Sequence, residues 1–131
     1  MNTKQKGDIA VAHAIHYFTL AGYEVCLPIG DKRNYDLVVE KSYKLETVQV
    51  KYAGLYPSKD SQCHVGLRIT GGNQSYSRAK KYGDDAFNLL FVYTQKGERY
   101  LIPWQELEVR NEIAIEHPKY HRYNVTVIEQ G

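Results

Sequence analysis

An acidic, an amide and an ammonium side chain are spaced so that they can meet on one face of a β-hairpin. Asp36 begins an apolar run, and Gln49 and Lys51 follow thirteen and fifteen positions later. The polar loop at residues 41–44 separates the two β-rich segments, which favours a hairpin. Because side chains alternate along a strand, Gln49 and Lys51 share one face while the neighbouring valines point into a core. Such a polar surface suits metal-dependent hydrolysis of a phosphodiester.

The size and composition of the chain indicate one domain over residues 1–131. The 131 residues are 43% hydrophobic, which is enough for one core. With a net charge of only +2, any affinity for nucleic acid must come from clustered charge. The two cysteines form no CxxC pair, so free thiols are expected and a zinc site or disulfide framework is not. Without a signal peptide or a long apolar run, the expected location is the cytoplasm.

The first element is a helix. Apolar side chains recur at helical spacing from about Lys4 to Ala21. Asn2 or Thr3 can cap its start, and Gly22 can end it. The remaining chain alternates between apolar runs and turns.

Asp8 lies on or beside the stripe of this helix that packs inward. A carboxylate there has two explanations. It can be a first-turn acid that favours the helix dipole, or it can belong to a metal site with Asp36. The sequence leaves both open.

Strands follow the helix. The β-rich segments are residues 23–28, 35–40, 47–52, 63–70, 87–93 and 98–102, with weaker ones at 111–115 and 124–129. Residues 63–70 alternate between apolar and polar side chains, and the continuous apolar run at 87–93 is typical of a buried central strand. A short basic segment at 75–82 can be helical. The pattern predicts one α+β or α/β unit.

The order of elements around Asp36, Gln49 and Lys51 resembles the PD-(D/E)XK nuclease superfamily. The opening Lys6-Gly7-Asp8 and the later Tyr100-Leu101-Ile102-Pro103 resemble the small branch that includes cyanobacterial intron-encoded homing endonucleases. The resemblance covers most of the chain. It implies a restriction-endonuclease-like core, with a mixed central sheet, elements in the order αβββαβ and flanking helices.

Two positions depart from the superfamily pattern. Tyr35 stands where a proline usually precedes the aspartate, and Gln49 replaces the second acid. Gln49 still offers a neutral oxygen to a hard cation but brings no negative charge. The intron-endonuclease branch is similar in carrying glutamine there, so the glutamine does not by itself indicate an inactive enzyme.

The resemblance implies catalysis with Mg²⁺, or with Mn²⁺ in its place. Asp36, the Gln49 side chain, the Val50 carbonyl and Asp8 would hold the ion. Lys51 would stand beside the attacking water, where it can stabilise the phosphorane charge or help deprotonate the nucleophile. The alternative is an ordinary surface ion pair between Lys51 and Asp36.

Candidate DNA contacts fall into two groups. One group supplies charge to the phosphates, and its members are Lys32, Arg33, Arg78, Lys80 and Lys81. The other is the polar side of residues 63–70, where His64 and Arg68 could reach base edges. Two further histidines, His13 and His16, have helical spacing but no third ligand nearby, so a packed pair is expected.

These observations favour a Mg²⁺-dependent endonuclease for double-stranded DNA, most simply a site-specific homing endonuclease. One small catalytic unit carries one active site, so cutting both strands predicts a homo-oligomer, either a dimer or a tetramer. A nuclease similar to Holliday junction resolvases is the first alternative. The second is a DNA-binding protein that kept this fold and lost turnover.

Overall fold

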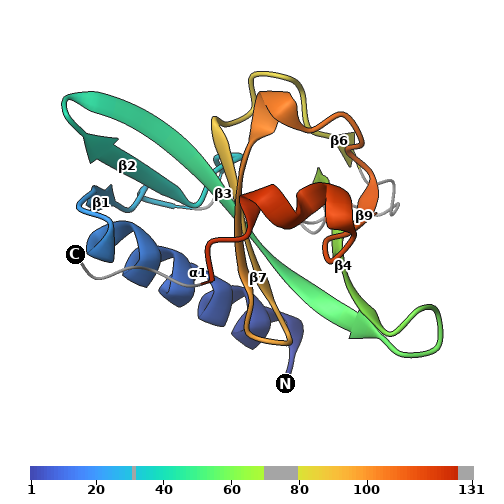
Figure 1. Ribbon diagram of the computed structural model, residues 1–131. Coiled ribbons are helices and arrows are strands. Elements are labelled where there is room, and N and C mark those ends of the chain that lie inside the picture. Colours follow the sequence, from blue (N-terminus) through green and yellow to red (C-terminus); the bar gives the residue numbers. More distant parts are fainter. Residues whose placement is uncertain (31, 70–79, 127–131) are drawn as a thin grey trace.

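The computed structural model describes residues 1–30, 32–69 and 80–126. The helix α1 (Thr3–Leu20) lies along one face of a mixed seven-stranded sheet (Figure 1). The strand order is β1-β2-β3-β4-β9, with β7 beside β3 and β8 beside β7, while β5 and β6 form a separate ribbon. The remaining elements are β1 (Glu24–Cys26), β2 (Leu37–Lys41), β3 (Lys44–Tyr56), β4 (Gln62–Gly66), β5 (Arg68–Ile69), β6 (Lys80–Lys81), β7 (Leu89–Thr94), β8 (Arg99–Pro103), β9 (Glu112–Ala114) and two 3-10 helices, η1 (Trp104–Glu106) and η2 (Pro118–Tyr123).

The expected α+β class with a mixed sheet is confirmed. A second helix was expected near residues 75–82. Residues 75–79 lie outside the described part of the chain, and Lys80–Lys81 form strand β6 instead. The described part thus contains one α-helix, and no helix in it is long and apolar enough to cross a membrane.

Helix α1 begins and ends as its sequence predicts. Asn2 is the N-cap: its side chain accepts a hydrogen bond from the Gln5 backbone N–H, and the Gln5 side-chain oxygen accepts one from the Asn2 N–H. Gly22 follows the helix with a φ of 91°, a conformation that glycine adopts without strain. The Lys41 ammonium donates to the Ala21 carbonyl at 2.8 Å, which ties the helix end to β2.

Strand β3 organises the sheet because three strands pair with it. Antiparallel β2 pairs with its first part, parallel β7 with its middle and antiparallel β4 with its end. Val48 and Val50 face α1, where they pack with Ala10, Ala14 and Phe18. A second core of aromatic and aliphatic side chains, including Tyr82 and Trp104, covers the other face. The predicted alternation along β3 is therefore confirmed.

The hairpin of β2 and β3 is tighter than the four-residue loop expected. Lys41 pairs with Lys44, so only Ser42 and Tyr43 form the turn. Their φ angles are 54° and 67°. Positive φ at both central residues is the geometry of a type I′ turn, whose twist matches that of paired strands.

The predicted strand at residues 63–70 is interrupted. β4 ends at Gly66, and β5 at Arg68–Ile69 pairs with β6 instead of continuing the sheet. Between them the Leu67 N–H donates to the Asn111 carbonyl, next to the strand β9 that pairs with β4. The chain thus leaves the sheet at the first residue of β9, although apolar and polar residues still alternate in the sequence after that point. Residue 70 lies outside the described part.

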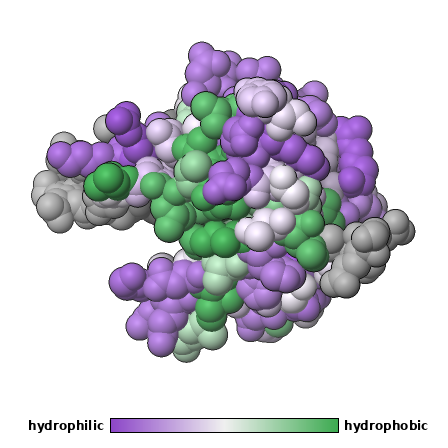
Figure 2. Space-filling model, turned by 90° about the vertical axis from the view of Figure 1, so that its left-hand side faces the viewer, coloured by the Kyte–Doolittle hydropathy of each residue, from purple (hydrophilic) through white to green (hydrophobic). Residues whose placement is uncertain are grey.

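Hydrophobic residues reach the surface on the side that carries β1 and β2. Figure 2 shows them across the middle of this face, beside a notch between two mainly polar lobes. Ile29 and Tyr43 are fully exposed, and Leu27 and Leu45 are about two-thirds exposed. Both cysteines are free, as predicted; Cys26 is exposed and Cys63 is buried.

His13 and His16 attach α1 to β8 through one arginine. Arg99 donates to Nδ1 of His13 at 2.8 Å and to Nδ1 of His16 at 3.2 Å. The His13 ring also stacks on Tyr93, with 3.8 Å between the ring centroids. The pair is therefore packed against its neighbours, as expected.

We expect the protein to lose stability as the pH falls from 7 to 5. Burial, and then the charges of Arg99 and His16, lower the pKa of His13 below its ordinary 6.5. The unfolded chain therefore binds more protons, so stability present above pH 6.5 is lost as the pH falls toward the folded pKa. Because solvent screens this partly exposed group, the loss is below about 1 kcal/mol.

The measurement is urea unfolding at several pH values for the wild type and for His13→Gln. The variant should show a shallower pH dependence than the wild type. Equal slopes in the wild type and His13→Gln would contradict the assignment.

Candidate active site

Asp36 lies against β3 through its backbone and its carboxylate. Its N–H donates to the Val48 carbonyl at 2.8 Å. Its Oδ2 accepts hydrogen bonds from the Val50 N–H at 2.8 Å and from Gln49 Nε2 at 3.1 Å. The tight hairpin thus brings Asp36 and Gln49 together across thirteen positions of sequence, as their spacing predicted.

The Gln49 amide lies between two oxygens that suit a hard cation. Its Nε2 donates to Asp36 Oδ2 and, at 3.3 Å, to the Val50 carbonyl. The hydrogen bonds assign the nitrogen to this side of the amide, and a rotation of the amide would turn Oε1 toward the same two oxygens. A carboxylate, an amide and a carbonyl oxygen would then converge, which is a ligand set that fits Mg²⁺ or Mn²⁺.

Burial perturbs both charged groups of the site. It raises the pKa of Asp36, while the Val50 N–H and the charge of Lys51 act in the opposite direction. It lowers the pKa of Lys51, and the charge of Asp36 partly restores it. The charge of each group acts on the pKa of the other, so Asp36 and Lys51 interact electrostatically in a partly dehydrated place. Neighbouring groups of opposite charge whose pKa values are shifted by burial are found at many catalytic sites.

Tyr82 lies beside Lys51 and was not singled out by the sequence. The Lys51 Nζ lies 5.4 Å from the centroid of its ring, and the tyrosine is 8% exposed. Burial, and then the charge of Asp36, raise the pKa of Tyr82 to about 12. The phenol is therefore neutral at physiological pH. In the sequence Tyr82 only ends the basic segment, because no spacing rule relates it to Lys51.

Asp8 is placed apart from these groups. It is exposed on α1, and its carboxylate pairs with Lys4 at 3.3 Å. In the described ranges no three or more His, Cys, Asp or Glu side chains gather to hold a metal ion. Asp8 as a metal ligand stays a prediction, which requires its carboxylate to leave Lys4.

The candidate DNA contacts are only partly brought together. Lys32 and Arg33 are exposed in the loop that leads to Asp36. The backbone of Arg68 pairs with that of Lys81, and Ile69 with Lys80, so the β5–β6 ribbon joins the strand predicted to reach base edges to part of the predicted basic segment. Arg78 lies outside the described residues.

His64 is held by acidic neighbours. It is 9% exposed, its Nε2 lies 2.9 Å from both Asp60 oxygens, and its Nδ1 lies 3.7 Å from Glu112 Oε2. Its ring also stacks on Tyr56. Reading a base edge would require these contacts to break, so the predicted role of His64 in DNA recognition finds no support in this arrangement.

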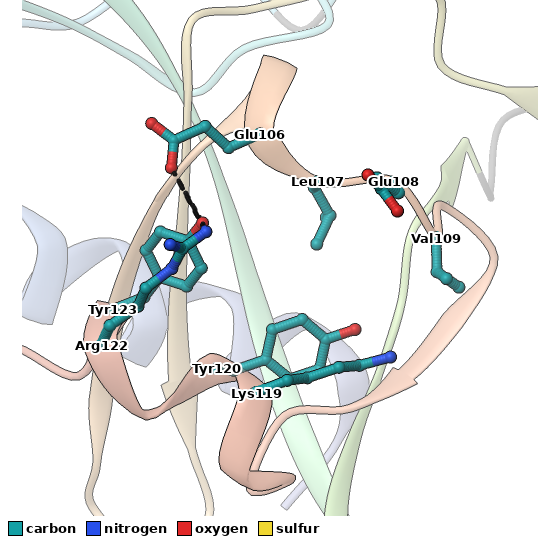
Figure 3. Close-up of a pocket in the computed structure, with 8 residues that line it drawn as sticks. All are labelled: Glu106, Leu107, Glu108, Val109, Lys119, Tyr120, Arg122 and Tyr123. Atoms are coloured by element: carbon teal, nitrogen blue, oxygen red, sulfur yellow. Dashed lines mark hydrogen bonds and ion pairs between the residues drawn. The ribbon is translucent and has the colours of Figure 1, made fainter.

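A separate cavity of about 210 Å³ lies between η1 and η2 (Figure 3). Leu107 and the Tyr120 ring face its interior, and Arg122 stacks on Tyr123 at one side. The Tyr123 hydroxyl donates to Glu106 at 2.8 Å. The lining includes none of the Asp36, Gln49 and Lys51 group, so we assign it no part in the site.

Comparison with known proteins agrees with this geometry. The sequence matches the family described as PD-(D/E)XK endonuclease over residues 1–129. The structure is similar to that of I-Ssp6803I, described as a bacterial homing endonuclease, with 26% sequence identity and a TM-score of 0.77. That similarity covers 95% of this chain and 89% of the other. No curated protein matches significantly. The restriction-endonuclease-like fold is thereby confirmed.

We expect Asp36→Asn to raise the stability of the metal-free protein at pH 7 and to abolish its stabilisation by Mg²⁺. Because the pKa of Asp36 is raised, its ionised form opposes folding above that pKa, and a neutral amide removes this penalty. After allowance for screening and for the lost attraction to Lys51, the gain is at most about 1 kcal/mol. Saturating Mg²⁺ should stabilise the wild type by about 2–3 kcal/mol at a hundredfold excess over Kd.

Thermal unfolding in EDTA and in Mg²⁺ measures both effects. Asp8→Asn is the matched variant: a weaker Mg²⁺ effect would place Asp8 among the ligands, and an unchanged effect would exclude it. Full Mg²⁺ stabilisation of Asp36→Asn would refute the ligand set.

Proposed function

The chain belongs to the PD-(D/E)XK endonuclease family, and we propose that it cleaves double-stranded DNA with Mg²⁺ at specific sites, as a homing endonuclease. The observation that carries the proposal is the convergence of Gln49 Nε2 and the Val50 N–H on Asp36 Oδ2, beside Lys51. The structural similarity to a bacterial homing endonuclease supports the finer assignment.

Asp36, Gln49 and the Val50 carbonyl would hold the metal ion. A bound Mg²⁺ supplies a Lewis acid that lowers the pKa of water and polarises a phosphate oxygen. Mn²⁺ prefers the same oxygen ligands and can replace it. The lack of a second acid leaves the metal site less negative than a two-carboxylate site, so Asp36 carries most of the electrostatic attraction.

Lys51 acts on the substrate side of the same strand face. Its ammonium lies in the field of Asp36 and is partly dehydrated, which strengthens its attraction to an anion. A phosphodiester at this face gains negative charge as water attacks it, and Lys51 would stabilise that charge. Its lowered pKa also makes the neutral amine easier to form, and the neutral amine can accept a proton from the attacking water.

Exposed cations near the site would hold the DNA backbone. Lys32 and Arg33 precede Asp36 in the chain, so phosphates bound there would lie close to the metal site. Lys80 and Lys81, whose backbone pairs with that of Arg68 and Ile69 in the β5–β6 ribbon, would contribute a second stretch of charge. These contacts would fix the position of the duplex without reading its sequence.

We expect DNA cleavage to require a divalent metal ion, Asp36 and Lys51. Asp36→Asn removes the ligand charge and Lys51→Ala the cation, so each should lower the single-turnover rate by about 10²–10³-fold. Lys119→Ala, on η2, is the control and should cut at the wild-type rate. The substrates are supercoiled plasmid, a randomised duplex library and four-way junctions, each with Mg²⁺, Mn²⁺ or EDTA.

The substrate that is cut decides between the candidate activities. Cleavage of a few library sequences would establish the homing endonuclease, whereas preferential cleavage of four-way junctions would establish a resolvase. DNA binding without any metal-dependent cleavage would instead identify an inactive DNA-binding protein.

A homo-oligomer is part of the proposal, because each chain supplies one site and a duplex has two strands. Tyr120 and Tyr123 are poor candidates for the contact, since Tyr120 is buried and the Tyr123 hydroxyl is hydrogen-bonded to Glu106. The β2–β3 hairpin is a better one, because Tyr43 is fully exposed and Leu45 is 66% exposed.

Sedimentation velocity at micromolar concentration should therefore show a dimer or tetramer. Leu45→Glu, which places a charge on the exposed apolar surface, should shift the protein toward monomer. Val109→Glu, at a 45% exposed position elsewhere, is the matched control and should leave the assembly unchanged. A wild-type monomer would contradict this part of the proposal.

A further inference from the structure

Lys51 lies over an aromatic ring that comes from a distant part of the chain. Its Nζ is 5.4 Å from the centroid of Tyr82, which directly follows strand β6. An ammonium within about 6 Å of a ring centroid is attracted to the ring face, more strongly where water is excluded. Tyr82 is 8% exposed, so this contact is largely dehydrated.

The Tyr82 ring has little freedom to move. It makes edge-to-face contacts with Phe87 and Trp104, with centroid separations of 5.1 Å and 5.9 Å. The Trp104 indole donates to the Gly83 carbonyl at 3.0 Å, next to Tyr82 in the chain. The Arg110 guanidinium covers the Trp104 ring at 4.6 Å. The ring is thus held by Phe87, Trp104 and the chain at Gly83, none of which is a proposed metal ligand.

A neutral ring can hold a catalytic cation without neutralising it. A carboxylate in this place would neutralise part of the Lys51 charge, whereas a ring face attracts the ammonium and carries no opposite charge of its own. The flat apolar surface also limits the positions of a long flexible side chain, which otherwise samples many rotamers. A Lys51 ammonium held in one position favours catalysis, because the reaction requires a fixed geometry between the catalytic group and the phosphate.

We propose that Tyr82 is a positioning residue for the nuclease reaction: its ring face holds the Lys51 ammonium beside Asp36 and shields it from water. This proposal rests on the proposed nuclease function. The ring, and not the hydroxyl, performs the role, so phenylalanine should replace tyrosine and leucine should not.

The first test compares single-turnover cleavage by Tyr82→Phe and Tyr82→Leu. Tyr82→Leu should lower the maximal rate by about tenfold with little change in the DNA concentration at half-maximal rate, whereas Tyr82→Phe should stay within about threefold of the wild type. Tyr120→Leu is the control for a general loss of core packing. Tyr120 belongs to the same core, is 5% exposed and carries Lys119 at 5.3 Å from its ring centroid. That variant loses the same kind of contact away from the site and should retain the wild-type rate.

The second test needs no cleavage. Reductive methylation with formaldehyde and cyanoborohydride, followed by peptide mass spectrometry, measures how accessible each lysine is. Lys51 should react several-fold faster in Tyr82→Leu than in the wild type and Tyr82→Phe, and Lys119 should report the corresponding loss in Tyr120→Leu. If the wild-type protein cuts no DNA, the nuclease assignment fails while the labelling still tests the contact.

Two results would overturn the proposal. One is an unchanged Lys51 labelling rate in Tyr82→Leu. The other is a defect in Tyr82→Phe as large as that in Tyr82→Leu, which would assign the role to the hydroxyl.

Discussion

The structure depends on β3 being covered on both faces while one face still carries polar groups. Val48 and Val50 are buried under α1, which sets the register of the strand, since a shift by one residue would exchange its faces. That register places Gln49 and Lys51 opposite the helix, and the hairpin turn brings Asp36 to them. The packing of α1 on the valines therefore determines where the polar groups meet.

The same burial makes the site costly to fold. It raises the pKa of Asp36 and lowers that of Lys51, so both groups are displaced toward their neutral forms. Their mutual attraction and the hydrogen bonds from Gln49 and Val50 offset part of this penalty. Buried charged groups that lower the stability of a fold are typical of functional sites. The aromatic cluster around Tyr82 supplies the rigid apolar packing that limits the access of water.

Local patterns predicted the elements that depend on neighbours in sequence. The capping residue Asn2 and the stop at Gly22 depend on side chains within a few positions, and both are found as predicted. The β2–β3 hairpin also followed from alternation and a polar turn, although its turn is shorter than expected. The alternation rule was not sufficient at residues 63–70, where it predicted one strand. The chain forms two strands there, because it leaves the sheet at Gly66 and the second strand pairs with β6.

The meeting of Asp36, Gln49 and Lys51 follows from local patterns in the sequence, because a short hairpin links these residues and strand periodicity orients them. The remote groups around them depend on how distant segments pack. Tyr82 reaches Lys51 through the packing of its ring on other aromatic side chains, a contact that carries no periodic signal. Asp8 has suitable chemistry, yet its exposed carboxylate pairs with a helix neighbour. Residue type states what a side chain can do, and packing between distant segments decides what it can reach.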